Sequence, residues 1–168
     1  AKALVRAGSP AQAQTLLQPL ADASPDDVEA HFLLGLVKNE LKDYQGAAVA
    51  LERAKAIDAS TPEIRNQLGL AYAEMGDYAR ALPELEFVFG KAPETPDFGY
   101  RLGLIHYGDT RYPPARDVLG VARSSAEVLH QRVLYLLGLT YERLGDRAQA
   151  DKNLRAEVAL APGTALAK

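Results

Sequence analysis

The sequence contains no cysteine, which excludes a disulfide framework and a thiolate metal site. This absence is compatible with an oxidising periplasm and with a reducing cytosol, so it does not identify the compartment. No run of lysine and arginine occurs, and the net charge of −3 is too small and of the wrong sign for a nucleic-acid-binding protein. No stretch approaches the roughly 18 consecutive apolar residues of a membrane-spanning helix. We therefore expect no nucleic-acid partner and no direct insertion into a membrane.

The composition is that of an ordinary soluble domain. The chain has 168 residues, of which 48% are apolar and 24% are charged, and this is enough to bury a real core. Residues Ala1–Arg6 include no initiator methionine and no apolar signal-peptide segment. We interpret this start as a cut end, left by processing or by expression of part of a longer protein.

Leucine-glycine pairs recur through the chain at a nearly constant spacing. The pairs are Leu34-Gly35, Leu68-Gly69, Leu102-Gly103 and Leu137-Gly138. Their glycines lie 34, 34 and 35 residues apart, and three such intervals in series indicate an internal repeat. Two further positions keep the spacing, an alanine at 47, 81, 115 and 150 and a leucine at 51, 85, 119 and 154.

Each unit of the repeat contains two helical segments of about a dozen residues, because apolar residues recur at helical spacing. A turn separates the segments at Gly76-Asp77 and Gly145-Asp146, and Lys42-Asp43 holds the same place in the first unit. Thr110 stands where a turn glycine is usual. Since the recurring alanine and glycine are small, we expect the two helices of each unit to approach closely there. Pro83 lies inside a second helix, where we expect a mild distortion.

This pattern resembles the tetratricopeptide repeat family over nearly the whole chain, since that family repeats a helix–turn–helix unit of 34 residues. The resemblance implies an all-α fold, a right-handed superhelical α-solenoid of antiparallel helix pairs. Extending the register backward places Gly8, Ala13 and Leu17 at the turn, small and leucine positions of an incomplete repeat. We expect a partial repeat at 1–27 and full repeats at 28–61, 62–95, 96–130 and 131–164. Together they would form one solenoid domain over 1–168.

The resemblance also implies a binding surface, because in this family the first helix of each hairpin lines a concave groove. Offsets of three and four residues share a helical face, so three rows around the Leu-Gly glycines belong to one side of the first helices. Adding the arginines beside these rows, the predicted groove comprises Phe32, Leu36, Asn39, Asn66, Leu70, Tyr100, Arg101, Leu104, Tyr107, Arg132, Tyr135, Leu139 and Glu142.

The leucines and aromatics of this surface have two interpretations. Contiguous apolar residues on a surface usually mark an interaction site, and these suit an amphipathic helix or an extended apolar peptide. Alternatively, the leucines are half-buried between adjacent first helices and only pack there. Tyr100, Tyr107 and Tyr135 would then still form a cluster with polar tips that suits an interface.

The charges near the groove are unevenly distributed. Acidic residues at the starts of the first helices also complement the helix dipole, which is sufficient to explain them. Arg101, Arg132 and Arg143 make the second half of the chain more basic. We expect this gradient to orient a bound segment with its acidic end over the arginines.

One subclass of the family grips the carboxylate tail of chaperones through groove lysine, asparagine and arginine residues. The matching positions here hold Phe32 and Leu36 in the first full repeat, and Gln67 replaces the usual asparagine in the next. Only Arg101 fits the pattern. We therefore reject that subclass for this chain.

No catalytic or metal-binding motif is present in the sequence. His106 occupies a tyrosine position of the repeat, and His31 and His130 have no partner at helical spacing for a metal pair. Ser124 and Ser125 lack the context of a nucleophile elbow, and no glycine loop suits a phosphate. The sequence predicts no enzymatic activity, no cofactor and no metal.

The favoured hypothesis is a protein–protein interaction module whose partner is another protein, a peptide, or a flanking segment of its own chain. The alternative is a structural scaffold or self-associating spacer, a homo-oligomer, within a larger protein. Repeats rich in alanine are common in bacterial assembly and export machinery, so that setting follows from the resemblance alone. Fold by itself does not specify the partner.

Overall fold

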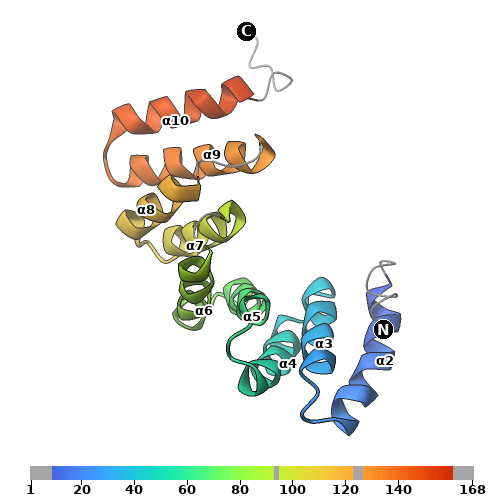
Figure 1. The fold of residues 1–168 in the computed structure, drawn as a ribbon. Helices are drawn as coiled ribbons and strands as arrows, with labels where there is room; N and C mark the ends of the chain where they lie inside the picture. Colours follow the sequence, from blue (N-terminus) through green and yellow to red (C-terminus); the bar gives the residue numbers. More distant parts are fainter. Residues whose placement is uncertain (1–8, 93–94, 123–126, 161–168) are drawn as a thin grey trace. The chain divides into compact units, whose positions relative to one another are not determined.

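The structure is a computed structural model that describes residues 9–92, 95–122 and 127–160, and every regular element within these ranges is an α-helix. The predicted all-α class is confirmed. The helices are α2 (Pro10–Ala23), α3 (Val28–Glu40), α4 (Tyr44–Ile57), α5 (Pro62–Glu74), α6 (Tyr78–Lys91), α7 (Pro96–Gly108), α8 (Tyr112–Ala122), α9 (Glu127–Arg143) and α10 (Arg147–Leu160) (Figure 1). Gly8, which was assigned to a turn of the partial repeat, lies outside the described residues, as do Ser124 and Ser125.

The helices are grouped into two compact units, Ala1–Val88 and Phe89–Lys168, called here unit 1 and unit 2. In unit 1, α3 packs against α2, α4 and α5, and α4 also packs against α5. In unit 2, α9 packs against α7, α8 and α10, and α7 also packs against α8. Within each unit, the first helix α3 or α7 therefore contacts its own second helix and the first helix of the following hairpin. The short turns within the hairpins make their helices antiparallel, as predicted.

The Leu-Gly glycines permit the close approach within each hairpin. A Cβ atom built on Gly35, Gly69, Gly103 or Gly138 would lie only 2.4 to 2.6 Å from a side-chain carbon of Leu51, Leu85, Leu119 or Leu154, respectively. Real carbon atoms do not approach so closely, so the second-helix leucine occupies the space that a side chain would need. The recurring alanines of the second helices are at most 3% exposed. The expected role of the small residues is confirmed.

Each hairpin turn has one residue in the left-handed region of backbone space. These residues are Lys42, Gly76, Thr110 and Gly145, with φ of 60°, 74°, 58° and 81°. Glycine adopts such a conformation without steric cost, whereas a β-branched residue such as Thr110 does not. The repeat therefore imposes the turn geometry even where the residue opposes it.

Aspartate caps begin three of the second helices. The side chains of Asp43, Asp77 and Asp146 accept hydrogen bonds of 3.0 to 3.1 Å from backbone N–H groups three residues onward. These bonds satisfy helix-start donors that have no partner inside the helix. Arg111 holds the equivalent place in the third full repeat. Helix α6 continues through Pro83 to Lys91.

A cluster of charged side chains joins α4, α5 and α6 in unit 1. We call it the α4–α6 charged cluster, and it consists of Glu52, Lys55, Arg65, Tyr72, Arg80 and Glu84. The carboxylate of Glu84, with a side chain 9% exposed, lies 2.9 Å from the Lys55 ammonium and 3.0 Å from the Arg65 guanidinium. A buried carboxylate held by two cations is satisfied, so the cluster links the first two full repeats.

A phenol and a second carboxylate complete this cluster. The hydroxyl of Tyr72 donates a 2.7 Å hydrogen bond to Glu52, and the Arg80 guanidinium lies 4.3 Å from the centre of the Tyr72 ring. Burial and the hydrogen bond to Glu52 raise the pKa of Tyr72 to about 12. Burial would raise the pKa of Glu52, but hydrogen bonds from Tyr72 and Lys55 outweigh it and lower that pKa.

Candidate functional site

The predicted groove residues of unit 1 lie on α3 and α5, and all of them are partly exposed. These residues are Phe32, Leu36, Asn39, Asn66 and Leu70. The helices that bear them pack directly against each other. The leucines of this half therefore contact solvent only in part. This agrees with the interpretation in which they mainly pack between adjacent first helices.

The two asparagines of unit 1 contribute to helix packing rather than to an open polar surface. The Asn39 amide donates to the backbone oxygen of Gln67 at 3.2 Å and to its side-chain oxygen at 3.3 Å, which ties α3 to α5. The side-chain oxygens of Asn39 and Asn66 are buried, and no donor among the described residues reaches them. A ligand in the groove would therefore contact mainly the apolar side chains of this half.

The first-helix face of unit 2 is more open. Leu104 on α7 is 41% exposed and Tyr135 on α9 is 52% exposed, whereas most leucines of the repeat core are below 5%. Tyr100 and Tyr107 are partly buried against the cluster around Leu119. Leu139 is also partly exposed. Unit 2 thus presents a large aliphatic and a large aromatic side chain to solvent from adjacent first helices.

A pocket of about 330 Å³ lies beside these residues. It is lined by Tyr100, Gln131, Arg132, Tyr135 and Glu157, so it includes three of the predicted groove residues. Aromatic rings with polar tips and charged groups at the edge are common features of binding sites, where the apolar surface supplies affinity and the polar groups orient the ligand. The structure therefore places these three predicted residues around one depression.

Two of the lining residues, Gln131 and Glu157, were not among the predicted groove residues. The Gln131 amide donates a 3.0 Å hydrogen bond to the Glu157 carboxylate, which connects the first and second helices of the last hairpin. The sequence did carry a signal, because Glu157 stands where Ala54 and Ala122 occupy the repeat.

The groove arginines differ in their surroundings. Arg101 forms an ion pair of 2.6 Å with Asp97 one turn earlier on α7, which reduces its net charge toward a ligand. Arg132 is exposed and lines the pocket. A hydrogen bond to Tyr107 raises the pKa of Arg143, so that guanidinium stays charged beside the tyrosine. Glu142 is exposed at the far end of α9 and belongs to another depression, beside Arg147 and Leu154.

The histidines occupy separate packed positions. His31 is 2% exposed, and its Nε2 lies 3.0 Å from the backbone oxygen of Pro25. His106 is 3% exposed, which agrees with a packing role at a tyrosine position of the repeat. Within the described residues, no group of three or more histidine, aspartate or glutamate side chains could hold a metal ion. Nor is any helix in these ranges long and apolar enough to cross a bilayer.

Comparison with known families identifies the repeats. One model of the tetratricopeptide repeat matches residues 1–62 and 66–127, and a second model of that repeat matches residues 131–164. The matched residues cover nearly all of the chain. A search of curated proteins found no significant match.

Comparison with solved structures identifies the same fold. A structure of MamA from Desulfovibrio magneticus RS-1 has a TM-score of 0.87 at 23% identity, covering 97% of this chain and 92% of that chain. A structure of MamA labelled MSR-1 has a TM-score of 0.85 at 24% identity, covering 97% and 93%. A structure of MamA labelled AMB-1 has a TM-score of 0.82 at 25% identity, covering 94% and 92%. The repeats and this fold fit a non-enzymatic protein–protein interaction module.

Proposed function

The chain belongs to the tetratricopeptide repeat family, and we propose that it binds an apolar peptide or an amphipathic helix of a partner protein on the first-helix face of unit 2, without enzymatic activity of its own. One observation carries the proposal. Tyr135, which is 52% exposed, lines a pocket together with Tyr100 and Arg132, and Leu104, which is 41% exposed, follows Tyr100 by one turn on α7. Exposed apolar groups gathered beside a depression are typical of a binding surface.

The chemistry of this face favours an occupant with apolar side chains on one side. Tyrosine rings and a leucine offer apolar area, while hydroxyl, guanidinium and carboxylate groups at the edge can bind a peptide backbone or polar side chains. Arg132 adds a positive charge at the pocket, whereas Arg101 is paired with Asp97. We therefore propose that an acidic residue of the ligand contacts Arg132, and we assign less of the orienting role to Arg101.

A peptide selection tests the proposal directly. A phage-displayed library of random peptides is selected on the immobilised full chain, and the Leu104→Glu variant provides the counter-selection. We expect enriched peptides to share apolar residues at helical or alternating spacing and an acidic residue toward one end. Because a carboxylate at position 104 would have to be desolvated beside apolar groups, binding of these peptides should fall at least about tenfold.

The control separates loss of the surface from loss of the fold. Val121→Glu also replaces an aliphatic residue of unit 2, which is 50% exposed, but it lies on the second helix α8. This variant should keep full binding. Enrichment of the same peptides on the Leu104→Glu chain, or no enrichment of apolar peptides at all, would contradict the proposed site.

Self-association is a second candidate, because apolar residues are also exposed on a second helix near the start of the chain. Leu16 and Leu20 of α2 are 55% and 45% exposed. In this alternative the chain acts as a scaffold whose apolar surfaces are covered by other copies. The mass of the protein in solution distinguishes the two candidates.

A further inference from the structure

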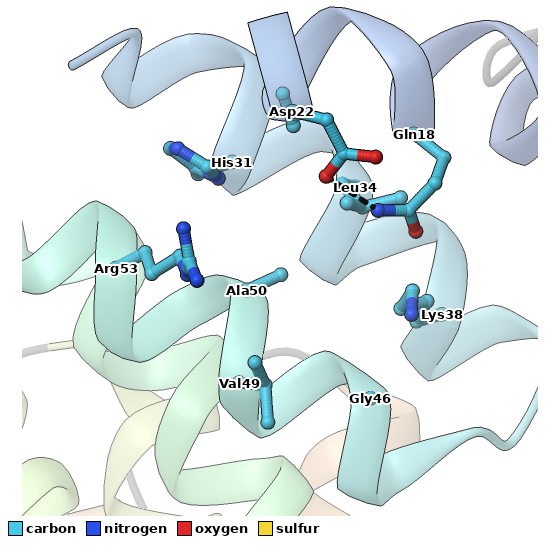
Figure 2. A pocket seen from close by; sticks show the side chains of 10 residues that line it. Gln18, Asp22, His31, Leu34, Lys38, Gly46, Val49, Ala50 and Arg53 are labelled. Carbon is cyan, nitrogen blue, oxygen red and sulfur yellow. Dashed lines mark hydrogen bonds between the residues drawn. The ribbon is translucent and has the colours of Figure 1, made fainter. Parts of the chain in front are cut away.

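Unit 1 contains a polar pocket between α2, α3 and α4, away from the groove residues of α3. We call it the α2–α4 pocket, and it is lined by Gln18, Ala21, Asp22, His31, Leu34, Lys38, Gly46, Val49, Ala50 and Arg53 (Figure 2). Its volume is about 110 Å³. Since one water needs only about 10–15 Å³ of such space, the pocket can receive the end of a side chain.

This pocket is the equivalent, one repeat earlier, of the α4–α6 charged cluster. A shift of 34 residues superimposes Ala21 on Lys55 and Ala50 on Glu84, and the same shift superimposes Gly46 on Arg80. The long side chains that fill the charged cluster are therefore absent from the α2–α4 pocket. The pocket exists because three small residues stand where the next repeat has two cations and a buried carboxylate.

Cationic groups nevertheless surround this pocket. The Lys38 side chain is 16% exposed, and its ammonium lies beside Gly46, where an added Cβ would be only 2.8 Å away. Its carboxylate partner, Asp43, is 3.5 Å away. Arg53 forms no ion pair with any residue that the structure describes, and in Figure 2 it stands with His31 at the opposite end of the pocket from Lys38.

One acidic group also faces the pocket. Asp22 accepts a 3.1 Å hydrogen bond from the Gln18 amide, and Figure 2 shows both side chains above the space that Ala50 borders from below. Asp43 offsets part of the charge of Lys38, but no carboxylate of the described residues forms an ion pair with the Arg53 guanidinium. The pocket therefore lacks a counterpart of Glu84, and its own cations, Arg53 and Lys38, stand where the next repeat has Phe87 and Tyr72.

We propose that the α2–α4 pocket binds the carboxylate of a glutamate or aspartate side chain of a partner protein. The carboxylate enters the pocket beside Ala50, the counterpart of Glu84, and the Arg53 guanidinium and the Lys38 ammonium, which line the same pocket, supply the positive charge. Such charge-assisted hydrogen bonds to a carboxylate are among the stronger polar contacts in proteins. The site is separate from the groove, because His31, Leu34 and Lys38 share one face of α3 while Phe32, Leu36 and Asn39 share another.

The test is a titration of the full ¹⁵N-labelled chain followed by amide chemical shifts. The probe is N-acetyl-glutamate N-methylamide, and its neutral match is N-acetyl-glutamine N-methylamide. We expect the glutamate compound to cause saturable shifts at Ala21, Gly46 and Ala50, and the glutamine compound to cause none there. Equal shifts from both compounds, or shifts that are not centred on these helices, would overturn the proposal.

Variants make the assignment specific to the pocket. Ala50→Glu should abolish the shifts because its own carboxylate occupies the site, and Arg53→Ala should weaken binding by about threefold to tenfold, as expected for a partly exposed ion pair. Asp22→Asn should strengthen binding because it removes a like charge. Arg116→Ala, which removes an arginine on α8 whose side chain is 42% exposed, is the control and should change nothing. Unaltered binding by the Arg53→Ala chain would refute the site, even if Ala50→Glu failed to fold.

Inorganic phosphate distinguishes a carboxylate site from a general anion site. With the carboxylate geometry proposed, phosphate should cause weaker shifts at the same amides than the glutamate compound. Tighter binding of phosphate would overturn the assignment to a carboxylate.

Discussion

The α2–α4 pocket and the α4–α6 charged cluster occupy equivalent places one repeat apart, but only the second is filled by the chain itself. The hairpins that contribute to them share one close contact, a leucine of the second helix against a glycine of the first, at Gly35 and Gly69. The pocket and the charged cluster differ in their side chains, since Ala50 in the pocket corresponds to Glu84 in the cluster. The repeats of this chain therefore share their helix packing and differ in the side chains that surround the contacts between helices.

Removal of the buried carboxylate should have the largest effect on stability. Glu84→Ala leaves the Lys55 and Arg65 cations without their shared partner, and both are only about a fifth exposed. We expect a loss on the order of 2–3 kcal/mol in the free energy of unfolding, somewhat below the cost of breaking a fully buried pair. Urea denaturation followed by circular dichroism measures this.

Glu40→Ala, at an exposed position at the end of α3, provides the control and should change stability by less than about 0.5 kcal/mol. Equal losses for the two variants would mean that the cluster does not hold the first two full repeats together. The charged side chains that fill the cluster would then add no stability that the unfilled pocket lacks.

Alanine substitutions at the shared glycine–leucine contact should destabilise both hairpins equally. Gly35→Ala and Gly69→Ala each force a methyl group against a buried leucine, which costs more than the gain in helix propensity. We expect each to lower the free energy of unfolding by about 1–2 kcal/mol. Gly90→Ala is a matched control, because nothing lies within 4 Å of the added Cβ, and it should be neutral or stabilising. A loss of stability at only one of the two glycines would show that the packing of the two hairpins differs.

Placing a glutamate carboxylate in the α2–α4 pocket, as in the charged cluster, should have a smaller effect on stability. Ala50→Glu puts into the α2–α4 pocket the residue that the charged cluster already has, within reach of Lys38 and Arg53. We expect the free energy of unfolding to change by less than about 1 kcal/mol, because attraction to partly exposed cations opposes desolvation and the nearby Asp22. A loss as large as that of Glu84→Ala would show that the pocket does not accept a carboxylate.

The pH dependence of stability should show the smallest difference between the charged cluster and the pocket. The pKa of Glu52 is lowered in the folded chain, so its stabilising contribution is present above its ordinary value of 4.5 and is lost as the pH falls through the lower folded value. The equivalent residue of the pocket, Gln18, does not titrate. Glu52→Gln should therefore flatten the acidic limb of thermal stability measured against pH, and an acidic limb of unchanged slope would contradict this.

Much of the fold could be predicted from the sequence because each repeat contains its own evidence. The glycine at the close contact and the leucine that fills it recur at fixed spacing in all four full repeats, and the turn aspartate recurs in three of them, so the copies support one interpretation. Thr110 shows the strength of that inference, since the turn forms there with φ of 58° although the residue disfavours it.

The sites were less predictable because they depend on which side chains meet after packing. Spacing places Leu36 and Leu104 in the same row, but only Leu104 is largely exposed. The α2–α4 pocket depends on Ala21 of α2 and Ala50 of α4, which are near each other only in the folded unit. Small residues in a sequence rich in alanine give no sign of a pocket by themselves.

Light scattering coupled to size exclusion, across a wide range of protein concentration, tests the central claim that this chain presents its groove to a different protein. We expect the mass of one chain at every concentration, with the face around Leu104 and Tyr135 open to a heterologous peptide. A stable dimer that the Leu104→Glu substitution dissociates would contradict it, because the groove would then serve self-assembly.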